Sequence, residues 1–140
     1  AVMSIQAFKS VEIGLGRATA ARWGSEVHDA IAYDESQRDS RQRGFTRDTN
    51  RAGGIEGGMS NGMPVVVTGA MKPISTLLRG LPSVNLTNMQ PEQSDYERSD
   101  VCAVSAASVV MQHALAFEIA AAVIDRFGGD TMKDLAARIC

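Results

Sequence analysis

The segment that most constrains the fold is the alanine-rich stretch Ala103–Phe127, near the end of the 140-residue chain. Its apolar residues recur at spacings of three and four, as on one face of an α-helix; they are Val109, Val110, Ala114, Phe117, Ala121 and Ile124. Gly128–Gly129 provides a stop. We expect Asp130 to cap a short final helix over Met132–Ile139.

Strand signals precede this helix. Alternating apolar and polar residues between Val2 and Gly14 predict a short strand, and the β-branched run Pro64–Met71 predicts another. The proline-containing stretch Leu77–Glu97 is predicted to be mostly irregular. Strands first and helices later, without a βαβ rhythm, predict an α+β fold.

Residues 34–50 carry eight charges and a single large apolar residue, Phe45, so they predict a long, exposed, flexible loop. Five arginines in or next to it could bind phosphates: Arg38, Arg41, Arg43, Arg47 and Arg51. Because Asp34, Glu35, Asp39 and Asp48 are interleaved with them, a solvated loop is favoured over a nucleic-acid site. One or two of the arginines could still reach an anionic ligand.

The composition argues against several classes of function. A net charge of −2 gives no basic field for nucleic acid or for a membrane surface. We expect no membrane-spanning helix, because Glu118 interrupts the best apolar run, Ala114–Ile124. Cys102 and Cys140 lack a metal-ligand spacing and are expected to be buried or idle thiols in a reducing cytosol.

The two histidines complete the inventory of possible metal ligands. His28 has acidic neighbours and could titrate near neutrality, whereas His113 lies among apolar residues of the predicted helix. Neither has the spacing of a metal ligand, so we expect no metal site.

A glycine-rich segment, Gly53–Gly62, has five glycines in ten positions. It lacks the Lys-Ser/Thr ending of a nucleotide P-loop. Two interpretations remain equal: an anion-binding turn, with Asn50 and Asn61 beside it for a heteroaromatic ligand, or a tightly packed entry into a strand. Gly14 and Gly16 imitate a dinucleotide-binding turn, but without the third glycine they are better explained as turning a strand.

Two further segments could meet an anion. Lys72–Thr76 offers a cation, two hydroxyls and a proline-stiffened backbone just after a predicted strand. Arg98–Ser99–Asp100 precedes the long helix. Ser99 or Asp100 is expected to be its N-cap, and Arg98 and Asp100 could at the same time form a pair at a helix end that favours anions.

Four segments resemble chorismate synthase in order and spacing: MSIQAFKSVEIG, GSEVHDAI, TNRAGGIEGGMSNGMPVVVTGAMKPIST and RSDVCAV. The resemblance covers nearly the whole chain but only the C-terminal part of that enzyme. The chain also begins without methionine, so we expect residues 1–140 to be a single-domain fragment of the family's β-α-β sandwich. The N-terminal part, with two acid/base histidines and several substrate-binding arginines, is then absent.

The resemblance implies a cytoplasmic, homotetrameric lyase of the shikimate pathway. Such an enzyme converts 5-enolpyruvylshikimate 3-phosphate to chorismate and phosphate by an anti 1,4-elimination that needs reduced FMN. NADP is associated with the family, although the source of the reductant stays open. We expect the fragment alone to be inactive. The alternative is a non-catalytic binding or oligomerisation module built on the same fold.

The resemblance also assigns site residues. The family's FMN contacts fall on Gln6, Ala7, Gly57, Lys72, Pro73, Ile74, Ser75, Thr76 and Arg98. Asp100 corresponds to the aspartate thought to assist proton removal near the flavin N5. The chain departs from the family at Gln6, where Asn or Pro is commoner, at Ser99, where His is commoner, and at the pair Gln112–His113.

Overall fold

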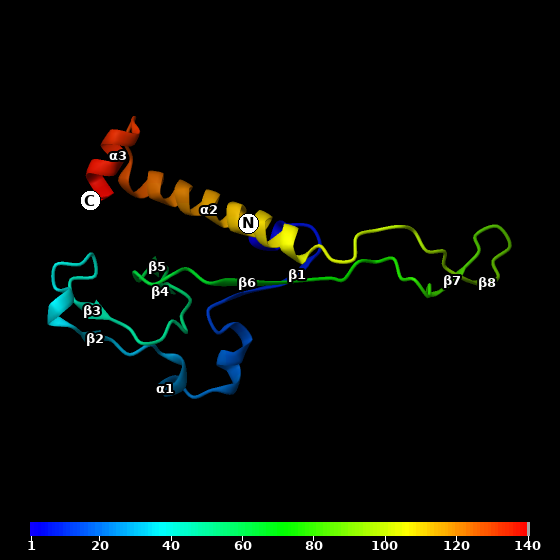
Figure 1. Ribbon diagram of the computed structural model, residues 1–140, viewed down its shortest axis with the longest axis horizontal. Coiled ribbons are helices and arrows are strands. Elements are labelled where there is room, and N and C mark those ends of the chain that lie inside the picture. Colours follow the sequence, from blue (N-terminus) through cyan, green and yellow to red (C-terminus); the bar gives the residue numbers. More distant parts are fainter. Residues whose placement is uncertain (140) are drawn as a thin grey trace. The chain divides into compact units, whose positions relative to one another are not determined.

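A computed structural model describes residues 1–139. The chain forms two compact units, which we call the helical unit (Ala1–Ala7 with the chain from Met71 onward) and the strand unit (Phe8–Ala70). Helices and strands are both present, so the predicted α+β class is confirmed (Figure 1). The assignment of the whole chain to one domain stays a prediction.

The strand unit is built from short elements. Strand β1 (Phe8–Ile13) pairs with β6 (Val67–Met71), whose last residue belongs to the helical unit. The prediction of β1 is therefore confirmed, while β6 begins three residues later than expected. The other elements are the 3-10 helices η2 (Gly16–Ala21) and η3 (Glu35–Gln37), helix α1 (Gly24–Val27), and strands β2 (Ala32–Tyr33), β3 (Phe45–Thr46), β4 (Ile55–Glu56) and β5 (Met59–Ser60).

The charged segment 34–50 is more ordered than its composition predicts. It contains η3, and its β3 pairs antiparallel with β2, placing Tyr33 opposite Phe45. The two rings meet edge to face with centroids 5.7 Å apart. Asp34 accepts hydrogen bonds from the backbone and hydroxyl of Ser36 and from Gln37, which lowers the pKa of its carboxyl. These contacts make the segment a turn between paired strands.

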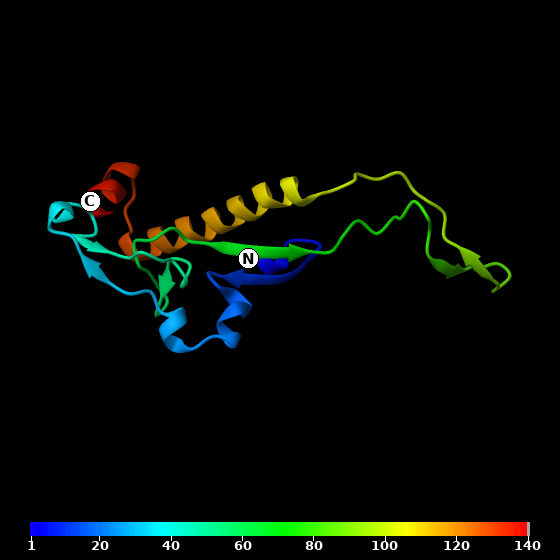
Figure 2. The same ribbon diagram turned by 60° about the horizontal axis from the view of Figure 1, so that its bottom comes forward.

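The helical unit contains the predicted long helix, α2 (Val104–Phe127), and the final helix α3 (Met132–Ile139). A 3-10 helix η1 (Val2–Ser4) lies against α2 (Figures 1 and 2). Gly128 ends α2 with a positive φ of 63°, as predicted. The cap of α3 is Thr131 and not Asp130: its hydroxyl accepts from the Asp134 N–H at 3.2 Å and donates to that carboxylate at 2.7 Å.

The segment predicted to be irregular, Leu77–Glu97, contains a β-hairpin. Strands β7 (Pro82–Val84) and β8 (Pro91–Gln93) pair antiparallel. All six strand residues are exposed. The rest of the stretch forms no helix or strand, in agreement with the prediction of a mostly irregular segment. The hairpin was missed because each strand begins with proline, a residue that normally argues against a strand and is tolerated at an edge.

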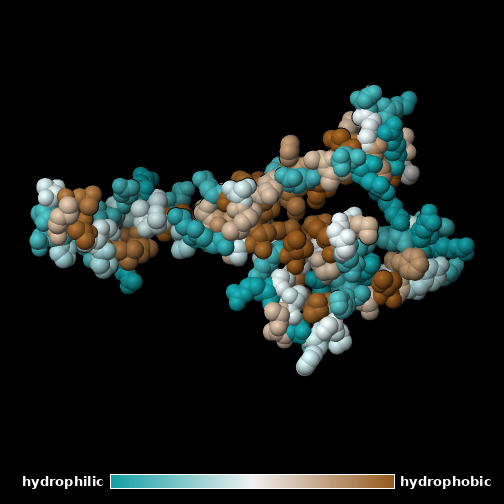
Figure 3. Space-filling view, turned by 180° about the vertical axis from the view of Figure 1, so that it is seen from behind, coloured by the Kyte–Doolittle hydropathy of each residue, from teal (hydrophilic) through white to brown (hydrophobic). Residues whose placement is uncertain are grey.

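No residue of α2 is buried within the described chain, and apolar atoms run along it in Figure 3. By length and composition alone, α2 is long and apolar enough to cross a membrane. The expectation that no stretch meets this criterion was therefore wrong. The same two properties also describe a helix that is covered by other parts of a protein, so they do not decide between these environments.

Candidate functional site

A cavity of about 490 Å³ lies within the helical unit. Three segments line it: Ile5–Ala7 from the N-terminus, Met71–Ser75 after β6, and the first turns of α2. The helix contributes Ala103, Ala106, Ala107 and Val110. The structure therefore brings together six residues that the sequence assigned to one site: Gln6, Ala7, Lys72, Pro73, Ile74 and Ser75.

The first two of these segments are joined by a backbone hydrogen bond, from Lys72 N–H to the Ala7 carbonyl at 2.8 Å. Ala7 has a φ of 69°, in the left-handed region. A non-glycine residue there is strained by roughly 1–2 kcal/mol. Such strain persists only where the surrounding structure imposes it, and it often marks a functional position. No local pattern of residues indicates this backbone conformation.

The α2 end of the cavity favours an anion. The N-cap residue of α2 is Ala103, whose side chain makes no capping hydrogen bond. The first turn of α2 contains no acidic residue. The prediction that Ser99 or Asp100 is the N-cap was therefore wrong. The backbone N–H groups at a helix start carry partial positive charge, and Lys72, a cationic residue, is among those that line the same cavity.

A smaller cavity of about 290 Å³ shares the segment Met71–Ile74 and is otherwise lined by Val101–Val104. Cys102 in this lining is an exposed thiol, so of the two expected states, buried or idle, it is not the buried one. Its Sγ accepts a hydrogen bond from Val104 N–H at 3.4 Å. The second cysteine, Cys140, lies outside the described residues.

Arg98 and Asp100 lie near this region without lining either cavity. Both are exposed, and their side chains make no hydrogen bond or ion pair within residues 1–139. Ser99 between them is hydrogen-bonded through Oγ to Thr76 Oγ1 at 2.5 Å. Thr76 and Arg98, both assigned to the site by sequence, are thus linked to each other by way of Ser99.

The glycine-rich segment divides into two parts. Gly53 and Gly54 are buried at positive φ, and a Cβ on either would collide with backbone, at Gly14 and Pro64 respectively. Asn50 supports this packing: its side chain accepts from Gly54 N–H and donates to the Pro64 carbonyl, both at 2.8 Å. For these glycines the interpretation as a tightly packed strand entry is the one that fits.

Gly57 and Gly58 form the two-residue turn between β4 and β5, with φ values of 57° and 77°. Two consecutive positive φ values are typical of the type I′ turn that suits hairpins. An added Cβ would meet nothing within 4 Å at either position, so this tip is open to an approaching molecule. Gly57 belongs to the strand unit, and its assignment to a cofactor site stays a prediction.

Sequence reasoning missed the role of Asp29, a buried carboxylate with 8% of its surface exposed. It accepts hydrogen bonds from Thr49 Oγ1 at 2.5 Å and from the N–H groups of Arg51 and Ala52, each at 2.9 Å. Burial alone raises the pKa of Asp29, but these hydrogen bonds and the charge of Arg51 lower it overall. Asp29 therefore anchors the backbone that enters the glycine-rich segment; its sequence signal was only an acidic residue beside His28.

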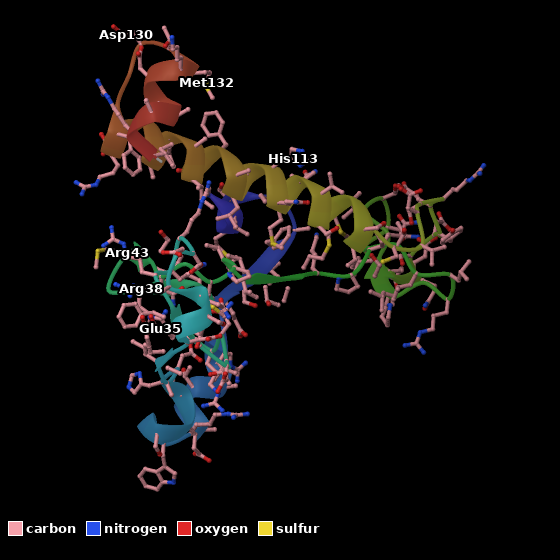
Figure 4. All side chains as sticks on the ribbon, turned by 60° about the vertical axis from the view of Figure 1, so that its left-hand side comes forward. Glu35, Arg38, Arg43, His113, Asp130 and Met132 are labelled. Atoms are coloured by element: carbon pink, nitrogen blue, oxygen red, sulfur yellow. The ribbon has the colours of Figure 1, made fainter. Side chains whose placement is uncertain are left out.

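Two arginines of the charged segment, Arg38 and Arg47, form local ion pairs. Arg47, largely buried, donates to Glu56 Oε2 at 3.1 Å and to the Asn61 carbonyl at 3.3 Å. Glu56 also accepts from the Asn61 side chain at 2.8 Å, so this asparagine is used internally. Arg38 pairs with Glu35 at 3.4 Å on the surface, while Arg43 projects separately (Figure 4).

Neither histidine joins a polar cluster. His113 is exposed on α2, with Nδ1 2.8 Å from the Val109 carbonyl (Figure 4). His28 is exposed at the end of α1. Within residues 1–139, no group of three His, Cys, Asp or Glu side chains could hold a metal ion.

Comparison with known proteins identifies the family. A family model described as chorismate synthase matches residues 1–124 of the 140. The chain belongs to the chorismate synthase family. It is 54% identical over 134 residues to the chorismate synthase of Caldicellulosiruptor bescii, covering 96% of this chain and 33% of the relative. It is 55% identical over 130 residues to that of Bacillus subtilis, covering 93% and 32%.

A solved structure titled "Crystal Structure of Chorismate Synthase" matches the fold of this chain with a TM-score of 0.71 and 40% sequence identity. The match covers 99% of this chain and 32% of the other. The chain thus spans about a third of the length of the chorismate synthases it resembles. The resemblance drawn from the four sequence segments is confirmed, as is the assignment to a fragment of this α+β fold.

Proposed function

We propose that this chain carries the main FMN-binding part of an FMN-dependent chorismate synthase. The observation that carries the proposal is the cavity of about 490 Å³ in the helical unit, where two segments assigned to one site, residues 6–7 and 72–75, line a common space with the start of α2. Its size falls within the roughly 300–1,000 Å³ typical of small-molecule sites. Relatives named chorismate synthase support the assignment of the enzyme class.

The residues present fit a flavin mononucleotide. The lining is largely apolar, with Ile5, Ile74 and Val110 joined by three alanines of α2, which suits an aromatic ring system. A phosphate needs positive charge and hydrogen-bond donors. Lys72, the Ser75 hydroxyl and the start of α2 provide these at the same cavity.

In this proposal the chain's own residues divide the work. Gln6, Ala7 and Lys72–Thr76 hold the cofactor, and Gly57 lets the backbone of its turn approach it. Arg98 neutralises the negative charge of substrate or cofactor. Asp100 is the catalytic residue, whose carboxylate assists removal of a proton near the flavin N5.

The reaction proposed for the whole enzyme is the anti 1,4-elimination of phosphate from 5-enolpyruvylshikimate 3-phosphate to give chorismate. Reduced FMN held by these residues would supply electron density for the loss of phosphate, in a reaction that is redox-neutral overall. The charge balance of the site supports this assignment, because Lys72 and Arg98 favour an anionic substrate and a departing phosphate. The cytoplasmic location, the association with NADP and a homotetramer belong to the same proposal.

The proposal is tested by titrating the chain with FMN, oxidised and reduced, and following flavin fluorescence and thermal stability. We expect quenching of the oxidised cofactor and a rise in the unfolding temperature with both forms, since a ligand that binds only the folded state stabilises it. Lys72→Ala removes the cation at the cavity and is expected to weaken FMN binding about tenfold or more, the order of a charge-assisted hydrogen bond.

A matched control is Lys133→Ala, which removes a lysine on α3, away from the cavity lining. It is expected to leave FMN affinity unchanged. If the wild-type chain binds FMN no better than the Lys72→Ala protein, the cofactor assignment fails. The exposed apolar face of α2 would then favour the second candidate, a non-catalytic oligomerisation module.

A further inference from the structure

Residues 77–97 of the helical unit extend away from its helices and carry the β7–β8 hairpin at their end (Figure 2). We call this segment, between Thr76 and Arg98, the excursion. The two ends of this excursion are joined by the 2.5 Å contact between Thr76 Oγ1 and Ser99 Oγ. Within residues 1–139, residues 73–76 and 95–100 make no other hydrogen bond. One hydroxyl pair therefore closes the base of the excursion.

This closure affects the site because of what lies on each side of it. Thr76 follows the segment Met71–Ser75 that lines the cavity. Ser99 lies between Arg98 and Asp100, whose exposed side chains make no hydrogen bond or ion pair with any of residues 1–139. Without the bond, no hydrogen bond would hold residues 95–100 between the hairpin and the start of α2 within the described chain, and fixing Arg98 and Asp100 beside the cavity would cost conformational entropy.

We propose that Ser99 is a positioning residue, whose hydrogen bond to Thr76 holds Arg98 and Asp100 beside the cavity segment Met71–Ser75. The inference rests on the proposed function, because the pair matters only if an anionic cofactor or substrate occupies that cavity. It predicts that removing the hydroxyl acts through Arg98, although Ser99 itself touches no ligand. Ser99→Thr retains a hydroxyl and should retain the effect.

The first experiment measures FMN affinity of the whole chain. Ser99→Ala is expected to weaken binding about three- to tenfold, the range of one neutral hydrogen bond. The decisive measurement is a double-mutant cycle with Arg98→Ala. Arg98→Ala should cost much less affinity in the Ser99→Ala background than in the wild type, because an unpositioned arginine contributes little. A merely structural role for Ser99 would leave the two losses additive.

The second experiment needs no flavin. Thr76→Cys and Ser99→Cys are combined in a Cys102→Ser, Cys140→Ser background and exposed to diamide. Because the two hydroxyl oxygens are 2.5 Å apart, sulfurs at these positions are expected to form a disulfide, seen as a mass decrease of about 2 Da. The oxidised protein should bind FMN more tightly than the same protein after reduction, a comparison in which every substitution is shared.

The outcomes separate the two proposals. If no disulfide forms, the excursion is not closed and the inference is overturned, whatever FMN does. If it forms but Ser99→Ala binds FMN like the wild type, or the cycle with Arg98 is additive, the positioning role is overturned while the cofactor assignment stands. If the wild-type chain does not bind FMN, the proposed function fails and the positioning role fails with it.

Discussion

The carboxylate of Asp29 holds in place a backbone segment, residues 49–52, that is distant from it in the sequence. Its two oxygens accept from the Thr49 hydroxyl and from the N–H groups of Arg51 and Ala52. These residues lead into Gly53, which has to lie flat against Gly14. Removing this buried carboxylate would leave three hydrogen-bond donors without a partner, and such a loss destabilises the folded state.

Asp29→Asn is therefore expected to lower the free energy of unfolding by about 1–3 kcal/mol, because an amide turns one acceptor into a donor facing N–H groups. The pKa of Asp29 is lowered in the folded state. Its stabilisation is thus complete above the unfolded pKa of about 4 and is lost as pH falls through the lower, folded pKa. Urea unfolding at several pH values, followed by Trp23 fluorescence, measures both effects.

Asp39→Asn is the control, since Asp39 is exposed in the same unit. It should leave stability at neutral pH within about 0.5 kcal/mol of the wild type. An Asp29→Asn protein as stable as this control would contradict the anchoring role. The anchoring role would also be contradicted if both variants lost the same free energy of unfolding as the pH is lowered.

Ala7 offers a test of backbone strain at the cavity. Its φ of 69° is costly for alanine but not for glycine. Ala7→Gly is expected to raise the free energy of unfolding by up to about 1 kcal/mol. The comparison is Ala116→Gly, an exposed alanine within α2, which should lower it by roughly 1 kcal/mol. Denaturant unfolding of the two variants would contradict the argument if both shifted in the same direction.

At the scale of elements, the sequence predicted what repeats locally. The bounds of helix α2 were predicted to within one residue. The spacing of its apolar residues and the glycines at its end are both local features of the sequence. The hairpins β2–β3 and β7–β8 have strands of two or three residues. Strands this short cannot show a recognisable alternation of apolar and polar residues. Whether they form depends on the strand with which they pair. Local sequence could not show it.

The candidate site divides in the same way. The segment Lys72–Ser75 was predicted as a clasp from its own residue types, and the structure places it in the cavity lining. The participation of α2, the left-handed Ala7 and the Thr76–Ser99 bond depend on residues far apart in sequence. The N-cap was predicted wrongly because Ser99 is used for that distant contact.

Substitutions at Gly57 in the β4–β5 turn can distinguish two roles of this glycine: adopting a positive φ, and leaving the backbone accessible to the cofactor. Asparagine tolerates positive φ in a type I′ turn, so Gly57→Asn should keep stability within about 1 kcal/mol of the wild type. Gly57→Val should cost more, because β-branched residues resist this conformation. If bare backbone at this tip meets the flavin, the Gly57→Asn protein will fold normally but bind FMN more weakly. Equal affinity would leave the glycine a turn residue only.

The whole molecule has very little core of its own. Within residues 1–139, the only buried apolar side chains are Val2 and Phe8, with 7% and 8% of their surface exposed. The apolar residues of α2 remain open, with 75% of Phe117 exposed. An exposed apolar stripe of this length is typical of a surface that binds protein or lipid.

We expect α2 to associate with protein and not to insert into lipid. The helix carries Glu118 near its middle and Asp125–Arg126 near its end, and a central acidic residue costs roughly 2.5–3.5 kcal/mol in a bilayer. Sedimentation should therefore show self-association that weakens in the Phe117→Ser protein, because a buried aromatic side chain contributes about 2–3 kcal/mol. Met132→Ser, which removes a similarly exposed residue of α3 (Figure 4), should leave association unchanged. Flotation of the wild type with neutral phosphatidylcholine vesicles, unaffected by Phe117→Ser, would contradict this prediction.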